Sequence, residues 1–456
     1  QRMTLPLALV TLISAFGSSF QYGYNVSVIN SPAPVDFYNR TYIDRHGVPM
    51  DASFQTLLWS LTVSMYPLGG FFGSLMVGPL VNNCGRKGTL LINNLFSIVA
   101  AVLMGTSEVA KTFEVIIVSR VIMGIYAGLA SNVVPMFLGE MSPRNLRGAI
   151  GIVPQLFITL GILIAQILGL TSILGHVKGW PLLLGLTGIP SALQLLTLPF
   201  FPESPRYLLI QKGNEDEARQ ALQRLRGWDD VDDEIEEMRQ EDKSEKEEGH
   251  LSVFTLCTFR GLRWQLISIV VMMMGQQLSG INAVFYYADR IFLSAGVETD
   301  HVQYVTVSIG AINVLMTLLA VFIVESLGRR ILLLAGFGLC CGSCAVLTLA
   351  LNLQVCSWCI LLLVLLVYFG VGVGGPIPFV MITEMFLQSS RPAAFMVGGS
   401  VHWLCNFTVG LVFLYMEAGL GAYSFLIFCG ICLATMVYIF FIVPETKNKT
   451  FMEINR

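Results

Sequence analysis

Polar side chains interrupt the long apolar stretches of this sequence at few positions, and most of them are carboxamides or aromatic residues with a polar atom. Those near the middle of a stretch are Gln21, Tyr22, Asn25, Gln155, Gln166, Gln276, Gln277, Asn282, Asn313, His402, Trp403 and Asn406. Carboxamides donate and accept hydrogen bonds, and an aromatic face covers the C–H side of a ring. Apart from Arg120 and the titratable His402, none of the mid-stretch residues is charged. Such a set suits a neutral solute with many hydroxyl groups.

Each of these residues, taken singly, has hydrogen bonding between packed helices as an alternative role. The stretch from Gly275 to Asn282 is different, because it combines two glycines with three carboxamides. A helix can unwind around a ligand at such a place. We therefore expect this stretch to bind the solute.

Charged residues recur at the ends of the apolar stretches in two matching groups. They are Arg86, Glu140 and Arg147 in the first half, and Glu325, Arg329, Glu384 and Arg391 in the second. Topology anchoring is one explanation, and exposed ion pairs contribute only about 0–1 kcal/mol. Anchoring explains the arginines but not the repeated glutamates. We therefore favour salt bridges between the two halves that break and re-form as a gate.

The elements that position these residues are membrane-spanning helices. The chain is 54% hydrophobic and 12% charged, and residues 203–263 alone hold 26 of its 57 charged residues. The apolar stretches exceed the roughly 20 residues that cross a bilayer. They lie near 5–29, 54–81, 88–107, 113–137, 150–173, 180–201, 263–292, 302–324, 331–353, 357–385, 393–417 and 421–443. This pattern predicts an all-α integral membrane protein with twelve transmembrane helices.

An internal repeat divides the chain into two halves. Gly85-Arg86-Lys87 recurs 243 residues later as Gly328-Arg329-Arg330, and Glu140 recurs as Glu384. Parallel repeats of this kind place a substrate site between the halves, near the middle of the membrane. We predict a six-helix bundle over 1–201, a cytoplasmic helical linker over 202–262, a second six-helix bundle over 263–443 and a cytoplasmic tail over 444–456. The linker is expected to form helices at Glu215 to Arg226 and Asp232 to Lys246 that brace the halves; the alternative is a solvated tether.

The orientation follows from the basic residues. The side that carries the termini and the linker holds 21 Lys and Arg residues, whereas the opposite side holds five. The positive side is the cytoplasmic one. The sequon at Asn39 lies in the longest loop of the opposite side, so we predict that Asn39 is glycosylated and that the protein is a multi-pass plasma-membrane protein with cytoplasmic termini.

Several classes of function are excluded. The net charge is −3 without a basic patch, which argues against nucleic acid as a partner. The ten cysteines are scattered and do not form a disulfide framework. The sequence offers no metal cluster, phosphate loop or catalytic triad, so we expect no enzyme, catalytic residue, metal or cofactor. The Gly-rich run before Pro376 and Pro378, which includes Gly374, is expected to be a hinge in a broken helix.

Together these motifs resemble the sugar-porter branch of the major facilitator superfamily. The resemblance rests on Gly85-Arg86-Lys87, Gly328-Arg329-Arg330, Pro202-Glu203-Ser204-Pro205-Arg206, Gln276 to Asn282 and Pro444-Glu445-Thr446-Lys447. Within that branch the chain is similar to the facilitative hexose transporters of animals. Proton-driven members carry an Asp where this chain has Asn25, so the resemblance implies uniport.

The resemblance also implies a set of site residues. The sugar site would be lined by Tyr22, Gln155, Gln276, Gln277, Asn282, Asn313, His402 and Trp403. The gate would contain Tyr286, Tyr287, Gly374, Pro376 and Pro378.

The expected substrate is fructose. Met273-Met274-Gly275 and His402-Trp403 are similar to the fructose-transporting members. Gly370 and Gly375 depart from those members, and Phe379 stands where glucose carriers have Trp. Another hexose or urate carrier of the same family and a non-transporting sugar sensor are the alternatives. The partners are then a small neutral sugar and the lipid bilayer, and we expect function as a monomer.

Overall fold

A computed structural model gives the structure of this chain. It describes residues 3–30, 33–170, 172–176, 178–248, 263–278, 287, 292, 301–353, 381–382, 384–386 and 391–444. Asn282, Tyr286, Gly374, Pro376, Pro378, the tail after Pro444, and the departing positions Gly370, Gly375 and Phe379 lie outside these residues. The secondary structure assigned within the described ranges is entirely helical.

The helices before the linker form the N-terminal set. They are α1 (Leu5–Ser14), α2 (Phe20–Ser27), α3 (Ala33–His46), α4 (Ala52–Leu75), α5 (Val77–Thr106), α6 (Glu114–Met141), α7 (Arg147–Leu168), α8 (Trp180–Gly185) and α9 (Gly188–Thr197). A π-helical turn, Ala15–Ser19, joins α1 to α2. Two helices of the linker follow, α10 (Glu215–Arg226) and α11 (Asp232–Glu248).

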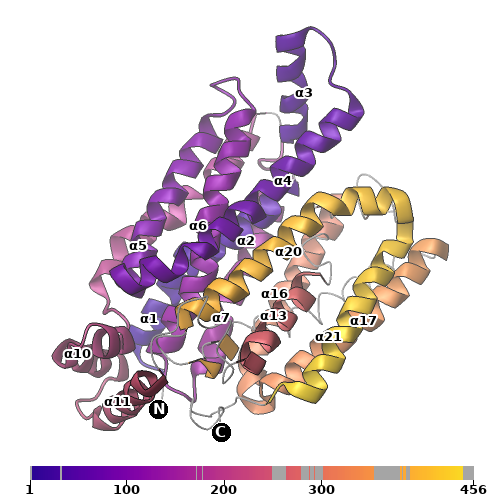
Figure 1. Cartoon of the computed structure of the whole chain (residues 1–456). Coiled ribbons are helices and arrows are strands. Elements are labelled where there is room, and N and C mark those ends of the chain that lie inside the picture. The colour runs from indigo at the N-terminus through magenta and orange to yellow at the C-terminus, as the bar shows by residue number, and fades with distance from the viewer. Residues whose placement is uncertain are drawn as a thin grey trace.

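The helices after the linker form the C-terminal set. They are α13 (Arg263–Gln277), α16 (Val302–Leu327), α17 (Arg329–Leu353), α20 (Arg391–Leu420) and α21 (Ser424–Ile442). The two sets lie side by side in Figure 1, with α10 and α11 at one end and α3 at the other. We call the end with α10 and α11 the linker side.

Nine helical segments of the described chain are long and apolar enough to cross a membrane. Of the other three predicted spans, 54–81 corresponds to α4 and the first turns of α5, and 263–292 begins in α13. The span at 357–385 lies almost wholly outside the described residues. The prediction of an all-α membrane protein is confirmed, and nine of the twelve predicted spans lie wholly within the described residues.

Glycine lets α4 and α6 approach within the N-terminal set. A Cβ atom added at Gly69 would lie 2.2 Å from the Val121 carbonyl oxygen, and one at Gly73 would lie 2.4 Å from that of Ile125. Side chains at these positions would therefore force the backbones apart. This contact lies within the N-terminal set.

The linker helices follow from local sequence. Asn214 caps α10 by accepting a hydrogen bond from the Glu217 N–H, and Gly227 ends the helix in the left-handed conformation at φ 77°. The predicted helices at Glu215 to Arg226 and Asp232 to Lys246 are both confirmed, the second extending to Glu248. On its inner side α10 buries Leu222 against Val231, Ile235 and Met238.

Candidate functional site: a central aromatic cluster and a charged closure

An aromatic cluster joins the two sets of helices at the centre of the molecule. The Tyr22 hydroxyl on α2 lies 3.2 Å from His402 Nε2 on α20. The Tyr22 and Trp403 rings are 5.1 Å apart, and Tyr66 meets the Trp403 ring edge-on at 5.8 Å. Tyr66 and Trp403 are fully buried. The cluster thus presents hydroxyl, imidazole and indole groups where two helix sets meet.

Sequence reasoning missed Tyr66 as part of this cluster. Its hydroxyl donates to the Tyr22 carbonyl oxygen at 3.1 Å, which ties α4 to α2. A tyrosine inside an apolar stretch gives no sequence signal that separates a binding role from packing. Only the crossing of α2, α4 and α20 brings it beside Trp403.

The predicted amide residues are spread over several helices around this centre. Gln276 and Gln277 are buried at the C-terminal end of α13. Asn313 is buried on α16, and Gln155 is half-buried on α7. The role of these four residues in sugar binding stays a prediction.

Gln166 on α7 is a mid-span amide outside the set of residues that the resemblance implies for the sugar site. Its side chain is 7% exposed, and Oε1 has no hydrogen-bond partner in the described chain. It faces Gly310 on α16 of the other set, where an added Cβ would lie 2.2 Å from that oxygen. A buried acceptor between the two sets is suited to a hydroxyl donor.

A buried cation lies beside the aromatic cluster. Arg120 on α6 donates to the carbonyl oxygen of Asn25 at 2.7 Å and to those of Thr62 and Val63 at 3.4 Å. Its guanidinium carbon lies 4.6 Å from the centre of the Tyr66 ring. Carbonyl dipoles and a π face thus hold this charge in the span. Asn25 contributes its backbone oxygen to this arrangement.

Tyr287 is the residue of the predicted gate that lies within the described part of the chain. Its hydroxyl donates to the Gly410 carbonyl oxygen at 2.7 Å, and its ring stacks on Phe413 at 5.8 Å. Both contacts lie on α20. Tyr287 is therefore fixed to the long helix that also carries His402 and Trp403.

The charged residues meet on the linker side. Glu140 at the end of α6 pairs with Arg86 at 3.0 Å and also accepts a hydrogen bond from the Ser204 hydroxyl at 2.6 Å. Arg391, at the start of α20, reaches Glu140 at 3.4 Å from the other set. Glu140 thus holds one arginine of its own set and one of the opposite set.

The second predicted group pairs within its own set. Arg329 contacts Glu384 at 3.0 Å, and both are buried. Arg147 is also buried, at the first turn of α7. Glu325 belongs to α16, but its side chain lies outside the described residues. The gating role of these residues stays a prediction. Arg391 makes one pairing across the two sets, with Glu140.

The linker adds an acid that sequence reasoning did not single out. Glu241 on α11 forms an ion pair with Arg206 and lies 3.6 Å from Arg391. Burial alone would lower the pKa of Arg206, but Glu241 and Glu237 outweigh it and raise that pKa. Glu241 is 5% exposed, so α11 covers the junction of the two sets.

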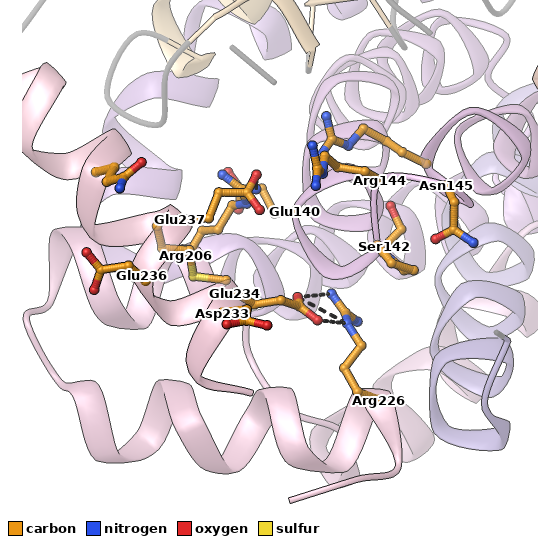
Figure 2. A pocket seen from close by; sticks show the side chains of 14 residues that line it. Glu140, Ser142, Arg144, Asn145, Arg206, Arg226, Asp233, Glu234, Glu236 and Glu237 are labelled. Carbon is orange, nitrogen blue, oxygen red and sulfur yellow. Dashed lines mark hydrogen bonds and ion pairs between the residues drawn. The ribbon is translucent and has the colours of Figure 1, made fainter. Parts of the chain in front are cut away.

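A charged cavity of about 810 Å³ lies between α11 and the end of α6. Figure 2 shows Arg226 of α10 bound to Glu234 of α11, and Arg144 on the turn before α7. Arg226 also donates to the Met141 carbonyl oxygen at 2.7 Å, which fixes the linker to α6. The cavity belongs to the contact between the linker and the N-terminal set.

Glu203 explains how the first Gly-Arg-Lys motif is built. The chain breaks helix at Gly85, where φ is +80°, and helix resumes at Arg86. The Glu203 carboxylate accepts from the backbone N–H groups of Arg86 at 3.1 Å and Lys87 at 2.9 Å. It therefore caps a helix to which it does not belong, and the helix dipole favours its charge.

The predicted glycosylation residue lies on α3, at the end far from the linker (Figure 1). Asn39 is half-buried, and its Oδ1 accepts a hydrogen bond from the Met50 N–H at 3.2 Å. No three His, Cys, Asp or Glu side chains are arranged as a metal site in the part of the chain that the structure describes.

Two packed sets of apolar helices, a polar centre between them and a charged closure at one end define a multi-pass membrane transporter. The chain belongs to the sugar (and other) transporter family, whose profile matches residues 10–456. It is thus a sugar transporter and not an enzyme.

Relatives with high identity extend over the whole chain. The facilitated glucose transporter member 5 of solute carrier family 2 is 65% identical in Bos taurus and 64% identical in Homo sapiens, with 92% of each relative covered. Member 7 of Homo sapiens is 57% identical over the whole chain and 90% of that protein.

Solved structures show the same fold. The proton:xylose symporter XylE bound to 6-bromo-6-deoxy-D-glucose has a TM-score of 0.86 at 24% identity, with 98% of each chain covered. The inward-open form of XylE from E. coli has a TM-score of 0.74, with 98% of this chain and 99% of that chain covered. The expected major facilitator fold is confirmed.

Proposed function

We propose that this protein is a facilitative uniporter for a neutral hexose, with fructose as the first candidate, and that it works by alternating access. The observation that carries the proposal is the contact of Tyr22 with His402 and Trp403 between the two sets. Its groups form hydrogen bonds and cover sugar C–H faces, and none of the three is a carboxylate. High identity to a facilitated glucose transporter over the whole chain supports it.

The sugar site would comprise the aromatic cluster with the neighbouring amides. We assign to it Tyr22, Gln155, Gln276, Gln277, Asn282, Asn313, His402 and Trp403. The gate on the far side would contain Tyr286 and Tyr287, with Gly374, Pro376 and Pro378 as the hinge. Sugar binding would replace the direct contact between Tyr22 and His402 with contacts through the sugar.

Closure at the linker side would be made by the charged residues. Arg391 contacts Glu140 at 3.4 Å and Glu241 at 3.6 Å, which are the atoms that must separate for the linker side to open. Arg86, Arg147, Glu325, Arg329 and Glu384 would complete the gating set.

The arrangement in the cell follows from the same proposal. The bundles would span 1–201 and 263–443, with the linker at 202–262 and the tail at 444–456 on the cytoplasmic side of the plasma membrane. The working unit would be a monomer.

Glycosylation of Asn39 is the test of orientation: an Asn39→Gln variant should lose the mobility shift that a glycosidase removes from the parent protein. Equal shifts in both would contradict this orientation.

Uptake into proteoliposomes tests the function. Radiolabelled fructose, glucose and urate are compared, each with and without a proton gradient. We expect fructose uptake that saturates and does not respond to the gradient. Counterflow separates a carrier from a sensor, because a sensor binds fructose without exchanging it. Uptake of urate alone would favour the urate-carrier alternative, and a response to the proton gradient would contradict uniport.

A further inference from the structure

One face of α20 packs against the N-terminal set with side chains of one set opposite glycines of the other. Met396, Gly399 and Trp403 are three and four residues apart, so they lie on the same face of the helix. Met396 projects onto Gly78, and Trp403 projects onto Gly70, whereas Gly399 receives the side chain of Asn132. Each contact pairs a glycine of one set with a side chain of the other.

Gly70 differs in kind from its neighbours on α4. A Cβ at Gly69 or Gly73 would meet backbone atoms of α6 in the same set. A Cβ at Gly70 would lie 2.3, 2.5 and 2.7 Å from three atoms of the Trp403 indole. The space at Gly70 is thus occupied from the opposite set.

The indole has no free direction in which to move. Trp403 is 0% exposed, its Nε1 donates to the Ser131 hydroxyl at 3.2 Å, and its ring is bounded by those of Tyr22 and Tyr66. Contacts below 3 Å require displacement, and a packed interior transmits it to the backbone. A methyl group at Gly70 would therefore push α20 away from α4.

We propose that Gly70 is a conformation-determining residue: the space left by its missing side chain is the socket that seats Trp403 only while the linker side is closed. When α20 leaves α4, Gly70 no longer faces the indole, and a methyl group there meets no clash. A substitution that penalises one state of a two-state equilibrium shifts the population to the other. This inference rests on the proposed alternating access.

Gly70→Ala tests the proposal through a conformational readout that needs no substrate. Spin labels are attached to the exposed native Cys84 and to Ile331→Cys at the exposed start of α17, with the other cysteines replaced. The distance distribution is measured in lipid. We expect the ratio of linker-side-open to closed molecules to rise at least about fivefold, since overpacking commonly costs about 1 kcal/mol or more.

The matched control is Gly73→Ala on the same helix. Its Cβ clashes with the Ile125 carbonyl oxygen inside the N-terminal set, so it should lower the yield or melting temperature without changing the distances in the folded fraction. Trp403→Leu supplies the second comparison. Adding Gly70→Ala to Trp403→Leu should produce less than about a twofold further change, because the clashing ring is gone.

Three results would overturn the proposal. They are an unchanged distribution in folded Gly70→Ala, an equal shift with and without the indole, and an equal shift in Gly73→Ala. If Gly70→Ala does not fold, Gly399→Ala takes its place, because its Cβ would lie 2.4 Å from Asn132 of the other set. The same shift toward opening is expected, and no shift would refute the interlocking face. Failure of fructose uptake with two distance populations intact would refute only the substrate.

Discussion

Glu241→Gln is the sharpest test of the closure on the linker side. Glu241 is an acid of the linker that contacts Arg206 of the linker and Arg391 of the C-terminal set. The substitution keeps the shape of the side chain but removes its charge and replaces one of its two acceptor oxygens with an NH2 donor. It therefore weakens the closed state, in which Glu241 and Arg391 are together, and leaves the open state unchanged.

The magnitude follows from the distances. At an effective dielectric constant of about 20, two charges at the 3.6 Å between Glu241 and Arg391 attract by about 4.6 kcal/mol before desolvation is subtracted. Arg391 retains Glu140 at 3.4 Å, and Arg206 retains Glu237 at 4.0 Å, so neither arginine is left unpaired. We therefore expect a net loss of about 1–2 kcal/mol, which is a five- to thirtyfold shift toward opening.

The assay is the distance between labels at Cys84 and Ile331→Cys, combined with fructose uptake. The population with the long distance should increase. High salt should reduce this increase little, because salt screens exposed ion pairs and Glu241 is 5% exposed. Glu236→Gln is the matched control, because Glu236 is an exposed acid on the same helix that forms no ion pair with the other described residues. It should leave the distances unchanged.

The reasoning is refuted if Glu241→Gln folds normally and gives the parental distance distribution. It is equally refuted if Glu236→Gln produces the same shift, since the net charge of α11 and not the contact with Arg391 would then control closure. A lower melting temperature without a change in the open population would assign Glu241 to stability alone.

Further predictions concern the centre and the first signature motif. Asn25→Asp puts a titratable carboxyl in place of a buried amide that donates to the Gln21 carbonyl oxygen at 2.8 Å, and uptake measured against external pH should become pH-dependent; a flat profile would show that this residue does not decide coupling. Tyr22→Phe removes the 3.2 Å contact with His402 and should weaken the apparent fructose affinity about five- to tenfold. The melting temperature should stay unchanged, and a lower one would assign Tyr22 to stability instead of binding. Glu203→Ala should destabilise the protein by about 1–2 kcal/mol in a thermal melt, because the part of α5 that resumes at Arg86 loses its cap. An unchanged melting temperature would contradict the capping role.

The spans and the linker could be predicted because they depend on local composition. Apolar stretches that exceed the bilayer thickness leave few alternatives to helix. The helix at Glu215 to Arg226 was bounded correctly, since Asn214 and Gly227 are a cap and a stop signal. The pairing of Arg391 with Glu140 could not be predicted in detail, because the repeat equally allowed each arginine to pair within its own half.

The sequence by itself determined that this chain is a membrane protein of two repeated halves with a neutral, hydrogen-bonding centre and a charged end. Hydropathy, charge placement and the recurring motifs are properties of the chain that need no coordinates. Only the tertiary structure decided which side chains meet between the halves. Tyr66 beside Trp403, Glu241 beside Arg391 and Gly70 beneath the indole are contacts between segments far apart in the sequence. The first and third exist because α20 packs against α4, and the second exists because α11 lies beside the start of α20.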